Sequence, residues 1–314
     1  DAMWLRDSSA QVYPYLQLMK DDQPLQQLIA GVINRQTRCI LKDPYANAFY
    51  KDDTKRGEWQ GDLTDMKPGV HERKWELDSP AALMRLSHAW WQGTGGATTP
   101  FDVPWQDAMA TLLTVLRTEQ GSAPGSGYRF QRTTRNPLDS LPRDGAGPPG
   151  APLGLIRSAF RPSDDACTLP FHVPSNFMLH GALGELIALT EALGLTALAR
   201  DAGRLRHDIG AALEALPVPW PYELDGFGSV LMMDDANVPS LLSLPWLGVV
   251  AKHDARWRAT REHILSPMSN PYFVRGSAAV QQALTGETLH SLAEAEESRE
   301  SQLPEPHSPQ AGPH

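Results

Sequence analysis

The chain has 314 residues, of which 41% are hydrophobic and 21% charged, a composition typical of a globular protein with one large domain or two small ones. Its formal net charge of -9 gives it no electrostatic attraction to nucleic acid or to an anionic membrane surface, so we expect neither as a partner. No apolar run approaches the roughly 20 residues needed to cross a bilayer, and we therefore expect a soluble protein.

Seven segments carry apolar residues at the i, i+3, i+4 spacing of a helix that buries one face. In chain order they are residues 24–41, 78–92, 104–120, 175–193, 196–215, 237–251 and 255–265. In the clearest pair, Ser175 suits an N-cap and Gly194 suits the stop between two helices, which predicts an αα-hairpin. The chain is therefore expected to be all-α.

Two segments lack this period. Residues 121–154 are rich in Gly, Pro, Ser and Arg, which fits either a flexible linker or a functional loop. From residue 287 the large apolar residues give way to Glu, Ser and Pro, which predicts a disordered tail over 287–314 and one domain over 1–286. The two cysteines, Cys39 and Cys167, are too few for a disulfide framework.

The sequence indicates little about the cellular compartment and does not indicate the oligomeric state. No N-x-S/T sequon occurs, which favours the cytoplasm over a secretory route. The chain starts at Asp1 rather than at Met and opens directly on a dense motif, which leaves room for a leader or an upstream domain.

Four segments concentrate Trp, carboxylates and amides: "WLRDSSAQ" (4–11), "KWELDS" (74–79), "FRPSDDA" (160–166) and "YELDGFGSVLMMDDANVPS" (222–240). Such residues near a helix start can simply satisfy free backbone N–H groups and complement the helix dipole. We expect Ser79 and Asn237 to act as caps of this kind. Asp7 and Asp78 fit capping and ligand binding equally well.

Capping does not require two successive carboxylates, which occur at Asp164–Asp165 and again at Asp234–Asp235. Adjacent carboxylates repel each other unless one is protonated or paired, and Arg161 is the obvious local partner for the first pair. We expect one member of each pair to be held in an ion-pair network and the other to be functional.

Carboxylates beside aromatic rings suit a sugar, which offers C–H faces for stacking and hydroxyls for hydrogen bonding. The possible stacking platforms are Trp4, Trp75, Trp220 and Tyr222, although a buried ring in a helical protein more often belongs to the core. The sequence has no G-x-S-x-G elbow, no phosphate-binding P-loop and no H-E-x-x-H zinc motif. A carboxylate mechanism with no metal and no cofactor is the interpretation that remains.

Ordered motifs run from Asp1 to about Ala279: "AMWLRDSSAQV", "WELDS", "FRPSDDAC", "PSN", "ELDGFG" and "LMMDDANVPSLLSLPWLG". Together they resemble the motifs of glycoside hydrolase family 125, the exo-acting α-1,6-mannosidases. The resemblance implies an (α/α)6 barrel, a toroid of helical hairpins with a pocket for a terminal mannose. It also implies a metal-independent inverting mechanism, with a carboxylic acid and a carboxylate base about 6.5–9.5 Å apart.

By this resemblance the general acid lies in "RPSDDA", as either Asp164 or Asp165, and the segment around "YRFQR" becomes an active-site loop rather than a linker. The substrate is expected to be a mannose-containing oligosaccharide or an N-glycan fragment. The candidate substrate contacts, or supports of such contacts, are Arg6, Asp7, Trp75, Glu76, Asp78, Arg161, Asn176, Asp225, Asp234 and Asp235.

The chain departs from the family pattern after "NPYFVRGSAA" (270–279), where the segment that bears the general base in the family is not found. One expectation is an exo-α-mannosidase, by ancestry if not by present activity. The alternative is a catalytically inactive, truncated mannose-binding homologue. A third interpretation is that the same fold serves a different sugar, since a fold does not determine a function.

Overall fold

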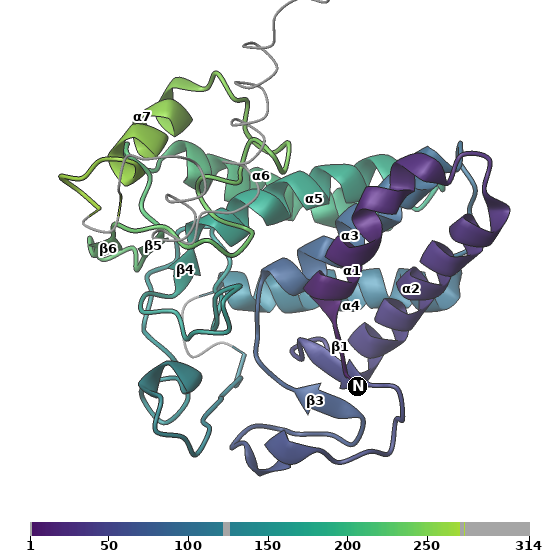
Figure 1. The fold of residues 1–314 in the computed structure, drawn as a ribbon, viewed down its shortest axis with the longest axis horizontal. Coiled ribbons are helices and arrows are strands. Elements are labelled where there is room, and N and C mark those ends of the chain that lie inside the picture. Colours follow the sequence, from purple (N-terminus) through teal and green to yellow (C-terminus); the bar gives the residue numbers. More distant parts are fainter. Residues whose placement is uncertain (1, 122–125, 271–272, 274–314) are drawn as a thin grey trace, which may run out of the picture.

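The computed structural model describes residues 2–121, 126–270 and 273, and all structural statements below concern these residues (Figure 1). Helices dominate this part of the chain. The described α-helices are α1 (Leu5–Val12), α2 (Gln23–Lys42), α3 (Asp78–Gly93), α4 (Val103–Gln120), α5 (Val173–Ala192), α6 (Thr196–Glu214) and α7 (Ala255–Ile264). None of the helices in these ranges is both long enough and apolar enough to span a membrane.

Six of the predicted helices are confirmed as α2 to α7. The helix predicted over residues 237–251 is wrong, because this segment forms successive turns. Pro239 and Pro245 lack the backbone N–H that a helix needs, and the Ser243 hydroxyl accepts the N–H of Ser240 instead. Asn237 therefore caps no helix and lies in a turn closed by Asp235.

The predicted αα-hairpin is present as α5 and α6, with Gly194 at φ 72° after the end of α5. Its N-cap differs from the prediction. Helix α5 begins at Val173, and the cap is His172, whose Nδ1 accepts the N–H of Ser175 at 3.3 Å. Burial lowers the pKa of His172 to about 3, so the ring is neutral and can accept this hydrogen bond. Ser79 caps no helix either, since α3 begins one residue earlier.

Alternate helices form two concentric arcs. Helix α3 packs against both α1 and α5, while α4 packs against both α2 and α6 outside them. The sequence explains this division: α5 is largely apolar without a single stripe and buries most of its residues, whereas α2 and α6 each bury a single stripe. This inner–outer alternation confirms the all-α, (α/α)6-type toroid, of which the described residues supply three pairs followed by α7.

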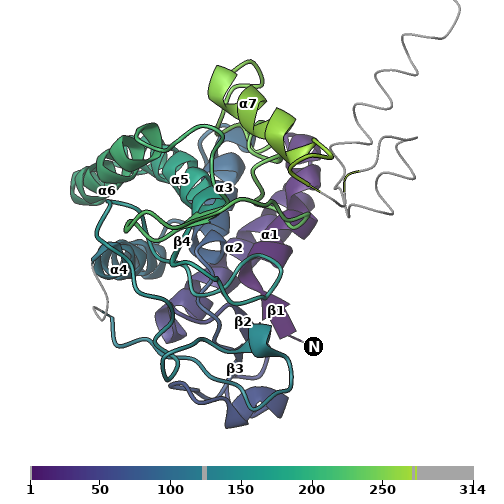
Figure 2. The same ribbon diagram turned by 90° about the vertical axis from the view of Figure 1, so that its left-hand side faces the viewer.

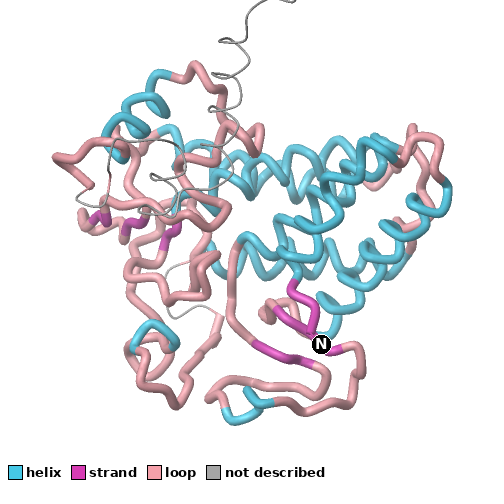
Figure 3. The backbone as a smooth tube through the Cα atoms, viewed as in Figure 1, coloured by secondary structure: helices cyan, strands magenta, loops and turns pink. Residues whose placement is uncertain are grey.

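Two small antiparallel sheets lie at the ends where the inner helices begin (Figures 1 and 2). One contains β1 (Ala2–Trp4), β2 (Ala48–Tyr50) and β3 (Val70–Glu72), and the other contains β4 (Phe171–His172), β5 (Glu223–Leu224) and β6 (Val230–Leu231). Strand β1 leads directly into α1, β4 leads directly into α5, and β3 precedes α3. Figure 3 shows that the loops gather on the same side of the helix array. This side presents the partly positive N-terminal ends of the inner helices α1, α3 and α5, which favour carboxylates.

The Gly-rich segment packs against the fold over residues 126–154. Phe130 is fully buried and Leu141 nearly so, and Arg132 forms an ion pair with Asp62 at 2.7 Å. The linker interpretation is therefore wrong for this part of the segment. The predicted tail over 287–314 and the departure from the family pattern after Ala279 lie outside the described residues.

Candidate active site

A buried carboxylate cluster lies where α1 and α3 begin. Arg6, in the first turn of α1, donates from Nη1 to Asp78 Oδ2 at 2.8 Å and to Glu76 Oε2 at 3.4 Å. Its Nη2 also lies 3.5 Å from Oδ2 of Asp7, whose side chain is 52% exposed. The side chains of Glu76 and Asp78 are 1% and 0% exposed. Three carboxyl groups thus share one arginine.

Asp164 adds a fourth carboxyl group to this cluster. Its charge acts on Glu76, so the two carboxyl groups lie near each other although the residues are far apart in the sequence. Burial raises the pKa of Glu76 well above its ordinary value; Arg6 opposes this, and the charges of Asp78 and Asp164 add to it. Burial likewise raises the pKa of Asp78. Because neighbouring carboxylates cannot all ionise in a buried site, the cluster retains a proton where an isolated carboxyl would lose it.

The two adjacent aspartates have different surroundings. Asp164 adopts a left-handed backbone conformation with φ 67°, which is uncommon for a residue with a side chain. Its Oδ1 is buried and accepts no hydrogen bond from the described residues. Asp165 instead accepts a hydrogen bond from the Ser163 hydroxyl at 3.3 Å. Geometry therefore separates the two carboxyl groups, and Asp164 is the one that faces the cluster.

Arg161 does not neutralise either aspartate, which corrects the expected ion pair. Its Nε donates to Glu223 Oε1 at 2.6 Å, and its Nη2 donates to the Thr168 hydroxyl at 3.2 Å. Only its backbone N–H reaches Asp165, whose carbonyl oxygen accepts it at 2.8 Å. Strand β5 places Glu223 beside the loop, and the fully buried Glu223 carboxylate attracts a buried guanidinium more strongly than the partly exposed carboxylates of Asp164 and Asp165 do.

Several predicted sugar contacts are used inside the fold. Asn176 is fully buried and exchanges hydrogen bonds with both backbone groups of Ile156, at 2.8 and 3.0 Å. Trp75 is 2% exposed, and its Nε1 donates to the carbonyl of Arg157 at 2.8 Å. It borders a cavity of about 360 Å³ that neither Asp164 nor Glu76 lines. Both residues therefore support the fold, because their polar groups are already satisfied by the backbone.

The other proposed stacking platforms differ in burial. Trp220 is 1% exposed and packs against Phe177, and Tyr222 is fully buried against His172. Trp4 is only partly buried, with its ring against His71 at 5.1 Å, and it ends β1, two residues before Arg6. Among the four proposed platforms, Trp4 is the one that stays partly exposed.

The aspartates of the 222–240 segment hold turns. Asp225 accepts the N–H groups of Phe227 and Ser229 at 2.8 and 3.0 Å between β5 and β6. Asp235 accepts the N–H of Asn237 at 2.9 Å. Asp234 accepts the N–H groups of Leu241 at 2.8 Å and Leu242 at 3.0 Å. These contacts explain the second aspartate pair without a ligand.

Asp234 also gives a testable pH dependence. Burial raises its pKa to about 7, outweighing the two N–H groups that favour its ionised form. The folded state therefore holds this proton more tightly than the unfolded chain, so its contribution to stability is lost as the pH rises from about 4 to about 7. Replacing Asp234 with Asn removes the ionisation. We expect the free energy of unfolding of the variant, measured by urea titration, to improve relative to wild type across this range; a constant difference would contradict the assignment.

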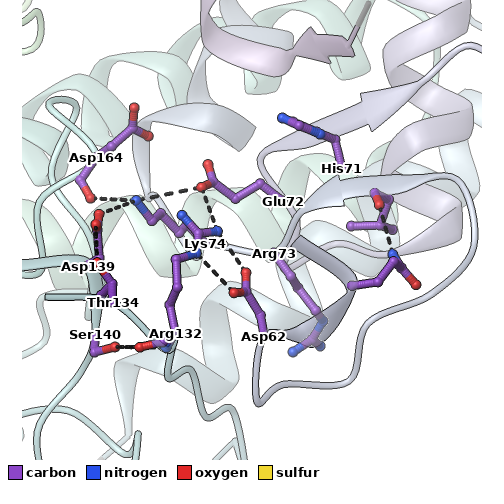
Figure 4. A network of polar contacts seen from close by, with 12 residues as sticks. Asp62, His71, Glu72, Arg73, Lys74, Arg132, Thr134, Asp139, Ser140 and Asp164 are labelled. Carbon is purple, nitrogen blue, oxygen red and sulfur yellow. Dashed lines mark hydrogen bonds and ion pairs between the residues drawn. The ribbon is translucent and has the colours of Figure 1, made fainter. Parts of the chain in front are cut away.

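The structure adds a polar network that sequence reasoning missed (Figure 4). Lys74 is 2% exposed, and its Nζ lies 3.6 Å from Glu72 Oε1 and 3.5 Å from Asp139 Oδ1. Arg132 bridges Glu72 at 2.9 Å and Asp62 at 2.7 Å. The run "HERKWELDS" carries a signal that could have found it, since five charged residues within seven positions are unusual in a buried segment.

Comparisons with known proteins identify relatives of this chain. The family model for metal-independent alpha-mannosidases (GH125) matches residues 1–287. The chain is 38% identical to the meiotically up-regulated gene 157 protein of Schizosaccharomyces pombe, covering 88% of this chain and 58% of that protein, so it spans little more than half the length of that relative.

A solved structure shares the fold as well. It is a metal-independent alpha-mannosidase from Streptococcus pneumoniae in a non-productive substrate complex with alpha-1,6-mannobiose. The TM-score is 0.84 at 40% identity, and the match covers 88% of this chain and 67% of the other. By sequence and by fold, the chain belongs to the GH125 family of metal-independent alpha-mannosidases.

Proposed function

We propose that this protein hydrolyses a terminal α-1,6-linked mannose from a mannose-containing oligosaccharide such as an N-glycan fragment. The observation that carries the proposal is the Asp164 carboxyl group, which lies beside the buried Glu76 and has one oxygen that accepts no hydrogen bond from the described residues. The alpha-1,6-mannobiose in the similar structure from S. pneumoniae supports the choice of linkage.

Asp164 is proposed as the general acid. A glycosidic oxygen leaves slowly as an alkoxide, and a carboxylic acid that protonates it removes this difficulty. The proximity to Glu76 supports this role, because Glu76 is a buried carboxyl group whose pKa is raised, so a group that holds its proton lies beside Asp164. Asp165 is the weaker candidate, since its carboxylate accepts the Ser163 hydroxyl in a local turn.

Arg6, Asp7 and Trp4 are proposed as substrate contacts. Asp7 is the most exposed carboxylate of the cluster, and Arg6 holds it beside Glu76 and Asp78. A carboxylate of this kind can accept hydrogen bonds from two sugar hydroxyls, while the Trp4 ring offers a face to the sugar C–H groups. Glu76 and Asp78 are proposed as supports, because both are buried behind Arg6.

We further propose that hydrolysis inverts the anomeric configuration. An inverting enzyme needs a second carboxylate that activates water from the opposite face of the sugar, a contribution worth about 100- to 10,000-fold. No carboxylate among the described residues is assigned to this role. The alternative function, binding of mannose without turnover, therefore stays open to the same experiment.

Proton NMR of α-1,6-mannobiose hydrolysis tests the proposal. We expect β-mannose to appear first and to equilibrate later with the α anomer, because water attacks from the face opposite the leaving group. The 1,2- and 1,3-linked α-mannobioses serve as controls for linkage and should react more slowly. Initial release of α-mannose would contradict inversion, and saturable mannobiose binding without release would replace the hydrolase with a binding protein.

A further inference from the structure

Lys74 connects the polar network to the backbone of Asp164. Its Nζ donates to the carbonyl oxygen of Asp164 at 2.8 Å, and its ammonium lies between Glu72 and Asp139 (Figure 4). The side chain is almost fully buried, between β3 and α3. A buried ammonium is retained in a fold only when it is paired, and here its shortest contact is with a backbone carbonyl rather than a carboxylate.

The backbone of Asp164 is held on both sides. The Lys74 ammonium binds its carbonyl oxygen, and its N–H donates to the carbonyl of Arg161 at 3.0 Å. This matters because φ 67° is a conformation that a residue with a side chain keeps only when its surroundings impose it. In Figure 4 the carbonyl oxygen of Asp164 faces Lys74, and its carboxyl group points away from Lys74.

We propose that Lys74 is a positioning residue, which fixes the left-handed backbone of Asp164 and so aims its carboxyl group at the glycosidic oxygen. This inference rests on the proposed role of Asp164 as general acid. Lys74 does not touch the reacting atoms and acts through Asp164 alone.

The rest of the network orients Lys74. Glu72 accepts hydrogen bonds from Asn47 at 3.0 Å and pairs with Arg132 at 2.9 Å, so its position is set from two elements. Asp139 comes from the Gly-rich segment, in the short helix Pro137–Asp139. The Gly-rich segment, through Asp139, and strand β3, through Glu72, therefore meet at the Lys74 ammonium. This contact explains how the Gly-rich segment, which has no hydrophobic period, contributes to the site.

The test is the variant Lys74→Met, which keeps the apolar stem and removes the ammonium. We expect kcat on α-1,6-mannobiose to fall roughly 100-fold, the cost of misplacing a catalytic group by about 1 Å, with KM little changed. An aryl α-mannoside whose phenol leaves without protonation should lose less than about 3-fold, because its hydrolysis does not need the acid. A variant that had merely unfolded would lose both activities equally.

Arg73→Met is the matched control. Arg73 is the adjacent residue and also a buried cation, but it pairs with Asp43 at 2.8 Å and does not contact Asp164. We expect it to lower thermal stability as Lys74→Met does while leaving the ratio of the two activities unchanged. An equal change of that ratio in both variants would overturn the inference.

The outcomes separate this inference from the proposed function. If Asp164→Asn loses mannobiose hydrolysis selectively and Lys74→Met does not, the acid assignment stands and the positioning role is wrong. If the wild-type protein hydrolyses neither substrate, the proposed function fails. A crystal structure of Lys74→Met then decides the positioning role: we expect Asp164 to leave the left-handed region, and an unchanged backbone would overturn it.

Discussion

Replacing Asp164 with Asn is expected to lower kcat on α-1,6-mannobiose by roughly 100- to 10,000-fold, the contribution of a positioned general acid. Asn keeps the size and hydrogen-bonding shape of the side chain but cannot donate a proton to the departing oxygen. The aryl α-mannoside with a strongly acidic phenol should retain most of its rate, since its leaving group needs no proton. Steady-state kinetics on the two substrates measure the effect.

Asp165→Asn is the control for this prediction. Asp165 has the same chemistry one residue away, but its carboxylate bonds to Ser163 rather than approaching Glu76. We expect a change of less than about 10-fold on mannobiose, because no proton is transferred from this group. The reverse result, with Asp165→Asn inactive and Asp164→Asn active, would show that the other aspartate is the acid.

Removing the Arg161 guanidinium is expected to cause the largest loss of stability. Arg161 Nε lies 2.6 Å from Glu223 Oε1, and the two side chains are 8% and 0% exposed. Arg161→Met leaves the buried Glu223 carboxylate without a cationic partner among the described residues, although it still accepts the N–H groups of Thr168 and Leu169. Breaking such a buried pair from one side costs roughly 3–5 kcal/mol, which urea unfolding would measure as a lower free energy of unfolding.

A second arginine–glutamate pair has the same contact distance as Arg161 and Glu223 but is far more exposed, so it serves as the control. Arg256 Nη1 also lies 2.6 Å from a carboxylate oxygen, that of Glu214, but these side chains are 35% and 75% exposed. Arg256→Met should cost less than about 1 kcal/mol, because water solvates the remaining carboxylate. Similar losses in the two variants would contradict the view that burial, rather than contact distance, sets the importance of Arg161.

The helices that pack along a regular apolar stripe were predictable, and the shorter or irregular elements were not. Helix α1 was missed because only Leu5 and Ser9 of its eight residues are buried, which leaves no period to detect. The segment 237–251 was misread because its leucines are buried in turns, so that apolar spacing imitated a helix. The strands have two or three residues each, too few for an alternating pattern to be visible.

The acidic motifs were found in the sequence, but their division into roles was not. Periodicity and turn residues are local properties, so the sequence by itself determined the helical architecture, the hairpin stop at Gly194 and, through its ordered motifs, the family. Only the tertiary structure decided that Arg161 pairs with Glu223 and that Asn176 and Trp75 belong to the core. It also decided that Glu76 and Asp78 meet around Arg6, with Asp164 beside Glu76. These are contacts between segments tens of residues apart, and the burial that sets their charges exists only once the chain is folded.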